Sequence, residues 1–139
     1  MSDKEKKGGF IELPHTADLA LCVWAPTMPE LFKTAALGMN ALAGIRSAPG
    51  PRVSRCIQVE GTDDEALLVA FLSEIIYLNE QENLAFDQFK LHINGSRLKA
   101  ILTGSTIYGA ARKIKAATYN DLRISHTRNG FETQIVFDV

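Results

Sequence analysis

Two aspartates near opposite ends of the sequence are the residues best suited to chemistry. Asp18 directly precedes the apolar run 19–25, so its carboxylate stands at the mouth of a predicted strand. Asp138 ends a second predicted strand and is followed by Val139, whose terminal carboxylate lies one residue away. Chain termini often lie near each other in folded domains. If the last strand runs beside the first, these oxygen ligands converge, and oxygen ligation favours Ca²⁺ or Mg²⁺ over zinc or copper.

Simpler interpretations remain open for these residues. Asp18 also fits a turn residue that bonds its own backbone, which is a common role for aspartate. His15 fits a hydrogen-bonding loop residue as well as a nitrogen ligand. Glu74 stands alone in an apolar helix, where it can reach a solvent edge, form a structural ion pair, or occupy a cleft with a raised pKa. No phosphate-binding glycine loop, Ser-His-Asp elbow or zinc signature is present, so motifs assign no enzyme class.

Composition places the chain among ordinary globular proteins. It has 46% hydrophobic and 22% charged residues and a formal net charge of −1. This charge provides no overall field for nucleic acid or an anionic membrane, so an RNA connection requires a partner or a local patch. We expect a soluble, cytoplasmic protein with a flexible lead over 1–9 and a single domain over 10–139. The two cysteines, which lack metal-site spacing, are expected to be free, packed thiols.

The first half of the sequence predicts two strands and two helices. The run 19–25 is apolar on both alternating faces and indicates a strand covered on both sides. Capping boxes opening at Thr27 and Thr62 predict helix starts, and Gly44 suits the end of the first helix. A half-exposed strand begins at Val53 between the helices. The second helix is apolar almost all round, so we expect it to be largely buried.

The second half predicts strands joined by hairpins. Asn-Gly pairs at 94–95 and 129–130 are strong hairpin signals. The segment 104–111 predicts an irregular connection, whereas 112–119 predicts a strand with a solvated basic face. The last strand is predicted over 131–139. Because the late strands are segregated from the helices, the expected fold is α+β, with mostly antiparallel sheet of about seven strands and two helices.

Five motifs in order give the chain a resemblance to the archease family, from Phe10 to Val139. Each motif is ordinary alone, but their shared order and the match at the last residue make the resemblance specific. The motifs are His15-Thr16-Ala17-Asp18, Pro29-Glu30-Leu31-Phe32, the helix segment 67–78, Lys115-Ala116-Ala117-Thr118-Tyr119 and Phe137-Asp138-Val139.

The resemblance implies a non-catalytic protein cofactor of the RNA-splicing ligase that joins tRNA halves, promoting guanylylation of the ligase and its multiple turnover. It implies a metal site at Asp18, Asp138 and Val139, with Ca²⁺ expected first and Mg²⁺ or Mn²⁺ as alternatives. Lys115 matches a lysine that helps to engage the nucleotide or the ligase. Direct strong nucleic-acid binding and membrane association are not expected.

Two alternatives accompany this interpretation. A chaperone-like module could act on a tRNA methyltransferase or another tRNA-modifying enzyme, with its acidic cluster purely structural. A small metal-dependent hydrolase using His15 as base is disfavoured, because no nucleophile stands at a recognisable spacing. The sequence also departs from the family pattern, which commonly has Asp and Asn at the positions of Ala70 and Ser73 and His at that of Asn120.

Overall fold

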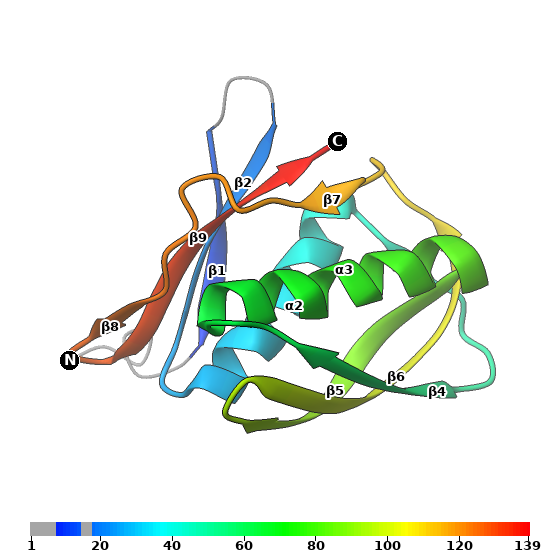
Figure 1. The fold of residues 1–139 in the computed structure, drawn as a ribbon. Coiled ribbons are helices and arrows are strands. Elements are labelled where there is room, and N and C mark those ends of the chain that lie inside the picture. The colour runs from blue at the N-terminus through cyan, green and yellow to red at the C-terminus, as the bar shows by residue number, and fades with distance from the viewer. Residues whose placement is uncertain (1–7, 15–17) are drawn as a thin grey trace.

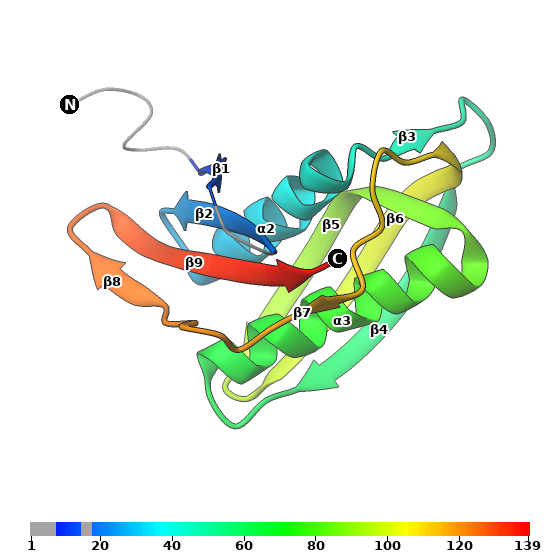
Figure 2. The same ribbon diagram turned by 90° about the horizontal axis from the view of Figure 1, so that it is seen from above.

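The computed structural model describes residues 8–14 and 18–139. Helices α2 (Met28–Ala43) and α3 (Asp64–Glu82) pack between two antiparallel sheets (Figure 1; Figure 2). The hydrophobic core contains side chains from both helices and both sheets, including the fully buried Phe71 and Phe137. This arrangement confirms the predicted α+β class with two helices and mostly antiparallel strands.

The first sheet contains the strands nearest both chain ends. Its order is β1 (Gly9–Leu13), β2 (Leu19–Ala25), β9 (Gly130–Asp138) and β7 (Ala116–Ala117), with β8 (Ser125–Thr127) also paired to β9. The sequence predicted β2 with the same bounds, but it did not predict β1. Residues 1–7 of the expected lead lie outside the described residues, and β1 begins just beyond them at Gly9.

The second sheet lies against the other side of the helices. The long strand β6 (Arg97–Gly109) occupies its centre and pairs with β3 (Arg46–Ser47), β4 (Val53–Glu60) and β5 (Leu84–Asn94). The predicted hairpin joins β5 to β6, but its two loop residues are Gly95 and Ser96, since Asn94 pairs with Arg97. Gly95, the first loop residue, has a positive φ of 61°, which suits a glycine. β3 was not predicted, so the described residues contain nine strands instead of about seven.

Helix α2 begins and ends as its sequence predicts. The Thr27 hydroxyl accepts a hydrogen bond from the Glu30 N–H at 3.3 Å, and Gly44 ends the helix in the left-handed region with φ 62°. The predicted apolar stripe is buried at all five positions, namely Phe32, Ala35, Ala36, Met39 and Leu42. Packing of this stripe holds α2 against β2, which carries the first candidate site residue at its start.

Helix α3 corrects one prediction. Its N-cap is Asp63 and not Thr62, because the Asp63 carboxylate accepts the Ala66 N–H at 2.7 Å. Its apolar side chains that face the sheets are buried, in line with the expectation of a largely buried helix, whereas Ser73 is exposed and Tyr77 is 57% exposed. One side of α3 therefore reaches solvent.

Replacement of Asp63 by alanine is expected to lower the free energy of unfolding by about 1 kcal/mol, because the first turn of α3 loses its side-chain acceptor. Thr62→Ala, one position earlier, removes a hydroxyl that does not cap the helix and is the matched control. Urea denaturation followed by circular dichroism measures both variants. Equal losses in the two variants would contradict the assignment of the cap to Asp63.

Two predictions in the second half were wrong. The segment 104–111 is not an irregular connection, because β6 continues to Gly109 and pairs with β5 as far as Thr106. The predicted strand 112–119 shortens to β7, since the chain before it leaves the sheets. There the N–H groups of Ala111 and Arg112 bind the Ala43 carbonyl at the end of α2, at 2.9 and 3.1 Å. Backbone bonding to a helix end replaces strand pairing.

Arg55, on β4, reaches the end of α3. Its Nε and Nη2 donate to Glu82 Oε1 at 2.9 and 2.6 Å. This hydrogen bond lowers the pKa of the Glu82 carboxyl. Arg55 thus links β4 to the last turn of α3 across the edge of the core.

Both cysteines are free, as predicted, but they differ in their surroundings. Cys56 is exposed on β4, so the expectation that it is packed was wrong. Cys22 is half-buried on β2, and burial, together with the nearby Glu132 carboxylate, raises the pKa of its thiol. Neither described helix is long and apolar enough to cross a membrane.

Candidate functional site

The pairing of β2 with β9 brings Asp18 and Asp138 to the same end of the first sheet. Leu19 pairs with Phe137 in the antiparallel register, Asp18 precedes Leu19, and Asp138 follows Phe137. Residues facing each other across such a pair have Cβ atoms about 4.5–5.5 Å apart. The start of β2 and the end of β9 lie side by side at one edge of the molecule (Figure 1), and each end of the sequence therefore contributes an aspartate there.

Strand β7 pairs with β9 on the side opposite to β2. Ala116 pairs with Asp138, and the Lys115 N–H donates to the Asp138 carbonyl at 2.9 Å. Two residues further along β7, the Thr118 N–H and hydroxyl both donate to the Val136 carbonyl, at 3.0 and 2.9 Å. The backbone around Asp138 is thus fixed from both flanking strands, which positions its side chain more precisely than a free chain end would.

The alternation of β9 determines where the Asp138 carboxylate lies. Ile135 and Phe137, two positions apart, have no exposed surface and face the helices. Successive side chains of a strand point to opposite faces, so Asp138 faces away from the core. Asp138 is exposed, Asp18 is half-buried, and Val139 is 43% exposed. The acidic groups are accessible to an ion or to another molecule.

The donor set fits a hard cation and does not fit a soft metal. Among residues 8–14 and 18–139, no three His, Cys, Asp or Glu side chains gather closely enough to hold a metal ion. A cation at this edge would therefore draw on the carboxylates of Asp18 and Asp138, with main-chain oxygen and water completing its shell. Ca²⁺ accepts six to eight such oxygen ligands in a flexible geometry, whereas structural zinc sites use Cys and His.

The remaining predicted site residues are placed differently. His15 lies outside the described residues. Lys115 is exposed and adjoins Asp138 through the backbone. Glu74 is half-buried on α3, which contacts β7. Among the ion pairs of the described residues, none joins Glu74 to Lys115. Lys115 thus lies at the edge that carries Asp18 and Asp138, which we call the carboxylate edge. Glu74 lies on the neighbouring helix α3.

The positions that depart from the family pattern lie at the surface. Ala70, Ser73, Glu74 and Tyr77 share one side of α3, because they are spaced by three or four residues. Asn120 is exposed in the turn after β7, and its N–H donates to the Thr118 hydroxyl at 3.3 Å. These departures therefore change groups that a partner could contact, while the core beneath them remains intact.

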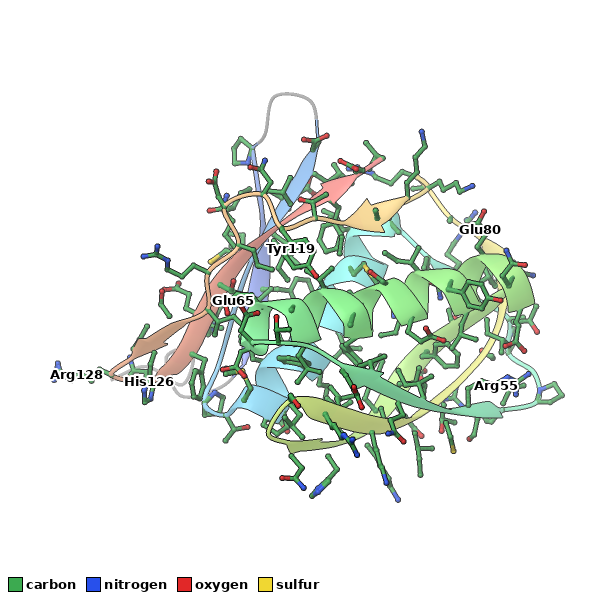
Figure 3. The ribbon with its side chains drawn as sticks, in the orientation of Figure 1. Arg55, Glu65, Glu80, Tyr119, His126 and Arg128 are labelled. Carbon is green, nitrogen blue, oxygen red and sulfur yellow. The ribbon has the colours of Figure 1, made fainter. Side chains whose placement is uncertain are left out.

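Glu65 has a role that sequence reasoning missed. It stands in the first turn of α3, where the helix dipole favours a carboxylate. In the structure its Oε2 accepts the Ile124 N–H at 2.9 Å, which ties the segment after β7 to the start of α3. The Thr133 hydroxyl adds a bond of 2.9 Å to the Arg123 carbonyl in the same segment. Figure 3 shows Glu65 and Glu80 at opposite ends of α3.

A pocket of about 420 Å³ lies at the Glu80 end of α3. Glu80 and Lys113 form an ion pair at 3.3 Å at this pocket. Its polar lining includes Asn79 and Asn83, whose amide groups donate to the Leu84 and Ile107 carbonyls at 2.6 and 3.0 Å. The sequence analysis did not predict this pocket, because its lining comes from segments that only the fold brings together.

Comparison with known proteins agrees with the fold. A solution structure of protein 1598 from Methanobacterium thermoautotrophicum matches with a TM-score of 0.73 at 22% identity, covering 94% of this chain and 99% of that one. A Thermotoga maritima crystal structure described as an archease and possible chaperone matches with a TM-score of 0.67 at 22% identity, covering 91% and 94%. At these identities the matches establish the architecture alone.

Sequence relatives are closer. A protein archease from Thermococcus gammatolerans is 35% identical over 125 residues, covering 84% of this chain and 87% of the relative. A protein archease from Methanosarcina acetivorans is 32% identical and matches over the full length of both chains. The model of the Archease protein family matches residues 10–139, from β1 through the carboxylate edge. The family-model match along this whole stretch, together with these relatives, leads to one conclusion: the chain belongs to the archease family.

Proposed function

We propose that this protein is a non-catalytic, divalent-metal-binding activator of an RNA-splicing ligase, acting in the cytoplasm. The observation that carries the proposal is the convergence of Asp18, Asp138 and Lys115 at one end of the β2–β9–β7 group. Membership of the archease family supports it, since the motif resemblance implies a metal site at Asp18, Asp138 and Val139 and a role in ligase guanylylation and turnover. The carboxylate of Val139 would be the third acidic group of the metal site.

The chain's own residues would act by positioning. Asp18 and Asp138 would hold the cation, Ca²⁺ first among the candidates, and the bonds from β7 to β9 would fix Asp138. When bound, the cation would supply a positive charge that phosphate oxygens can coordinate. The backbone of Lys115 adjoins Asp138, and its ammonium would add a second positive charge at this edge, since a lysine ammonium binds phosphate as a compact point charge. The edge would thus present charge to the ligase's nucleotide site, while bond making remains the ligase's task.

Multiple-turnover ligation of a broken tRNA by the matching ligase tests this proposal. The reaction is run without this protein, with it, and with its Asp18→Asn and Asp87→Asn forms. Asp87 is an exposed aspartate on β5 paired with Arg52, so it controls for the loss of one charge elsewhere. We expect stimulation by the native and Asp87→Asn proteins and at least a tenfold loss with Asp18→Asn. No stimulation by the native protein, or full stimulation by Asp18→Asn, would refute the proposal.

A second candidate function is a chaperone-like module that acts on a tRNA methyltransferase or another tRNA-modifying enzyme. Exposed apolar and aromatic side chains favour it: Tyr77 is 57%, Tyr119 61% and Ile11 52% exposed. The Thermotoga maritima relative carries the description of a possible chaperone. In this case Asp18→Asn leaves client binding unchanged and Tyr77→Ser weakens it, which a pull-down with the purified client measures.

A further inference from the structure

The outer face of the second sheet carries a group of basic side chains away from the carboxylate edge. Strands β4, β6 and β5 lie side by side, with both helices on one face only (Figure 1; Figure 2). Along β6, Leu98, Ala100 and Leu102 are buried against the helices, whereas Lys99 and Ile101 point outward. Ile101 is 44% exposed. The outer face is therefore uncovered along the middle of its central strand.

The register assembles this face into two rows. Lys99 pairs with Gln58 on one side and His92 on the other, and Ile101 pairs with Cys56 and Lys90 in the next row. These six outward residues, which we call the basic sheet face, line a shallow groove of about 600 Å³ together with the neighbouring strand backbone. Lys90 and His92 stand two residues apart on one strand, a spacing of about 7 Å.

The groove carries an excess of positive charge. Among the residues that the structure describes, no acidic side chain lines it. The acids at its borders are already paired with arginines: Glu60 with Arg97 at 3.1 Å, and Asp87 with Arg52. Within the described part of the chain, no ion pair involves Lys90 or Lys99. The groove thus presents lysine charge that the protein itself does not neutralise.

We propose that the basic sheet face binds the phosphate backbone of RNA. Lysine is a standard phosphate binder because its ammonium is a compact, rotatable point charge. Protein partners, by contrast, anchor on aromatic and arginine side chains buried in pockets, and the groove lining has none. Contacts of this kind position a nucleic acid without reading its sequence. This second site gives the activator its own hold on RNA, separate from the proposed metal site.

The two lysine charges set the expected strength of this interaction. Neutralising two phosphates gives a slope of log K against log salt of about −1.4 for single-stranded nucleic acid. The interaction is therefore weak at physiological salt and measurable at low salt. It becomes effective when the protein and RNA are held on one assembly, because tethering raises the effective concentration.

Fluorescence anisotropy of a labelled single-stranded RNA tests the proposal with the purified protein alone. The titrations contain EDTA and no ligase, so their outcome is independent of the metal site and of ligase activation. The variant is Lys90→Gln/Lys99→Gln. The control, Lys33→Gln/Arg128→Gln, removes the same charge from α2 and the β8–β9 turn. Thermal melts confirm that both variants fold, since all four side chains are outside the core.

We expect the native and control proteins to bind at 50 mM salt with a slope of about −1.4, and the Lys90→Gln/Lys99→Gln protein to bind at least tenfold more weakly with a slope close to zero. Equal binding by the two variants, or no binding by the native protein at 50 mM salt, would overturn the proposal. An acidic peptide such as polyglutamate is titrated in parallel. Its binding in preference to RNA would also overturn the proposal and assign the face to a protein partner.

Discussion

The Asp18→Asn variant is expected to lose most of the Ca²⁺-dependent rise in melting temperature that the native protein shows. A ligand at 100 times its dissociation constant stabilises the folded state by about 2.7 kcal/mol. For a domain of this size that corresponds to a rise of roughly 10 °C. Removing one of three proposed carboxylates withdraws a charged ligand from the cation, so the residual shift should be a few degrees at most. Differential scanning calorimetry with Ca²⁺ and with EDTA measures the difference.

The control for this experiment is again Asp87→Asn, which removes an aspartate on the second sheet. It should keep the full Ca²⁺ shift, because its partner Arg52 lies far from the first sheet in the fold. Mg²⁺ and Mn²⁺ are titrated in the same way to identify the preferred ion. A native protein whose melting temperature responds to none of the three ions, or an Asp18→Asn protein with an unchanged shift, would remove the metal site from the proposal.

Gly104→Ala is expected to cost about 3 kcal/mol or more of the free energy of unfolding. Gly104 lies on β6 where the register of β5 shifts between Phe86 and Gln88. A Cβ at this position would stand 2.6 Å from the Ala85 carbonyl carbon and 2.7 Å from Phe86 Cα. These are backbone atoms, so no side-chain rotation relieves the overlap, and β5 or β6 must move. Urea denaturation measures the loss.

The matched control is Gly50→Ala, in the loop between β3 and β4. A Cβ at Gly50 meets no atom within 4 Å, so this variant should unfold with unchanged stability. Because the Gly104→Ala overlap involves the sheet alone, its effect should appear in stability and leave Ca²⁺ binding by the folded fraction intact. A Gly104→Ala protein as stable as the native one would show that β5 and β6 can separate freely at this point.

The sequence predicts the fold where a local signal has a single physical meaning. Thr27 and Gly44 bound α2 because a cap and a left-handed end leave few alternatives. The Asn94-Gly95 turn likewise identifies the β5–β6 hairpin. Predictions failed where contacts with distant parts of the chain determine the local structure. Thr62 and Asp63 are both good caps, and only the packing of α3 selects Asp63. The glycines in 104–111 suggested a break, whereas pairing with β5 keeps this segment in the sheet.

The sequence likewise predicted only part of the candidate site. Residue type singled out Asp18 and Asp138, and the register of β2 with β9 is a long-range property that spacing alone does not contain. Glu65 shows the opposite case, since its carboxylate matches a familiar helix-start pattern while its hydrogen bond goes to Ile124 on a distant segment. The basic sheet face was also hidden, because Lys90 and Lys99 become neighbours only through the β5–β6 register.

The pairing of Leu19 with Phe137 has a consequence for the order of folding. Contacts between distant parts of a chain form late, because closing a long loop costs entropy before any contact repays it. During synthesis β2 leaves the ribosome long before β9, so α2, α3 and the β5–β6 hairpin can form before Asp138 is available to lie beside Asp18. A cation bound between β2 and β9 would stabilise a contact that forms late in folding. Such a contact would mainly lower the rate of unfolding and leave the rate of folding nearly unchanged.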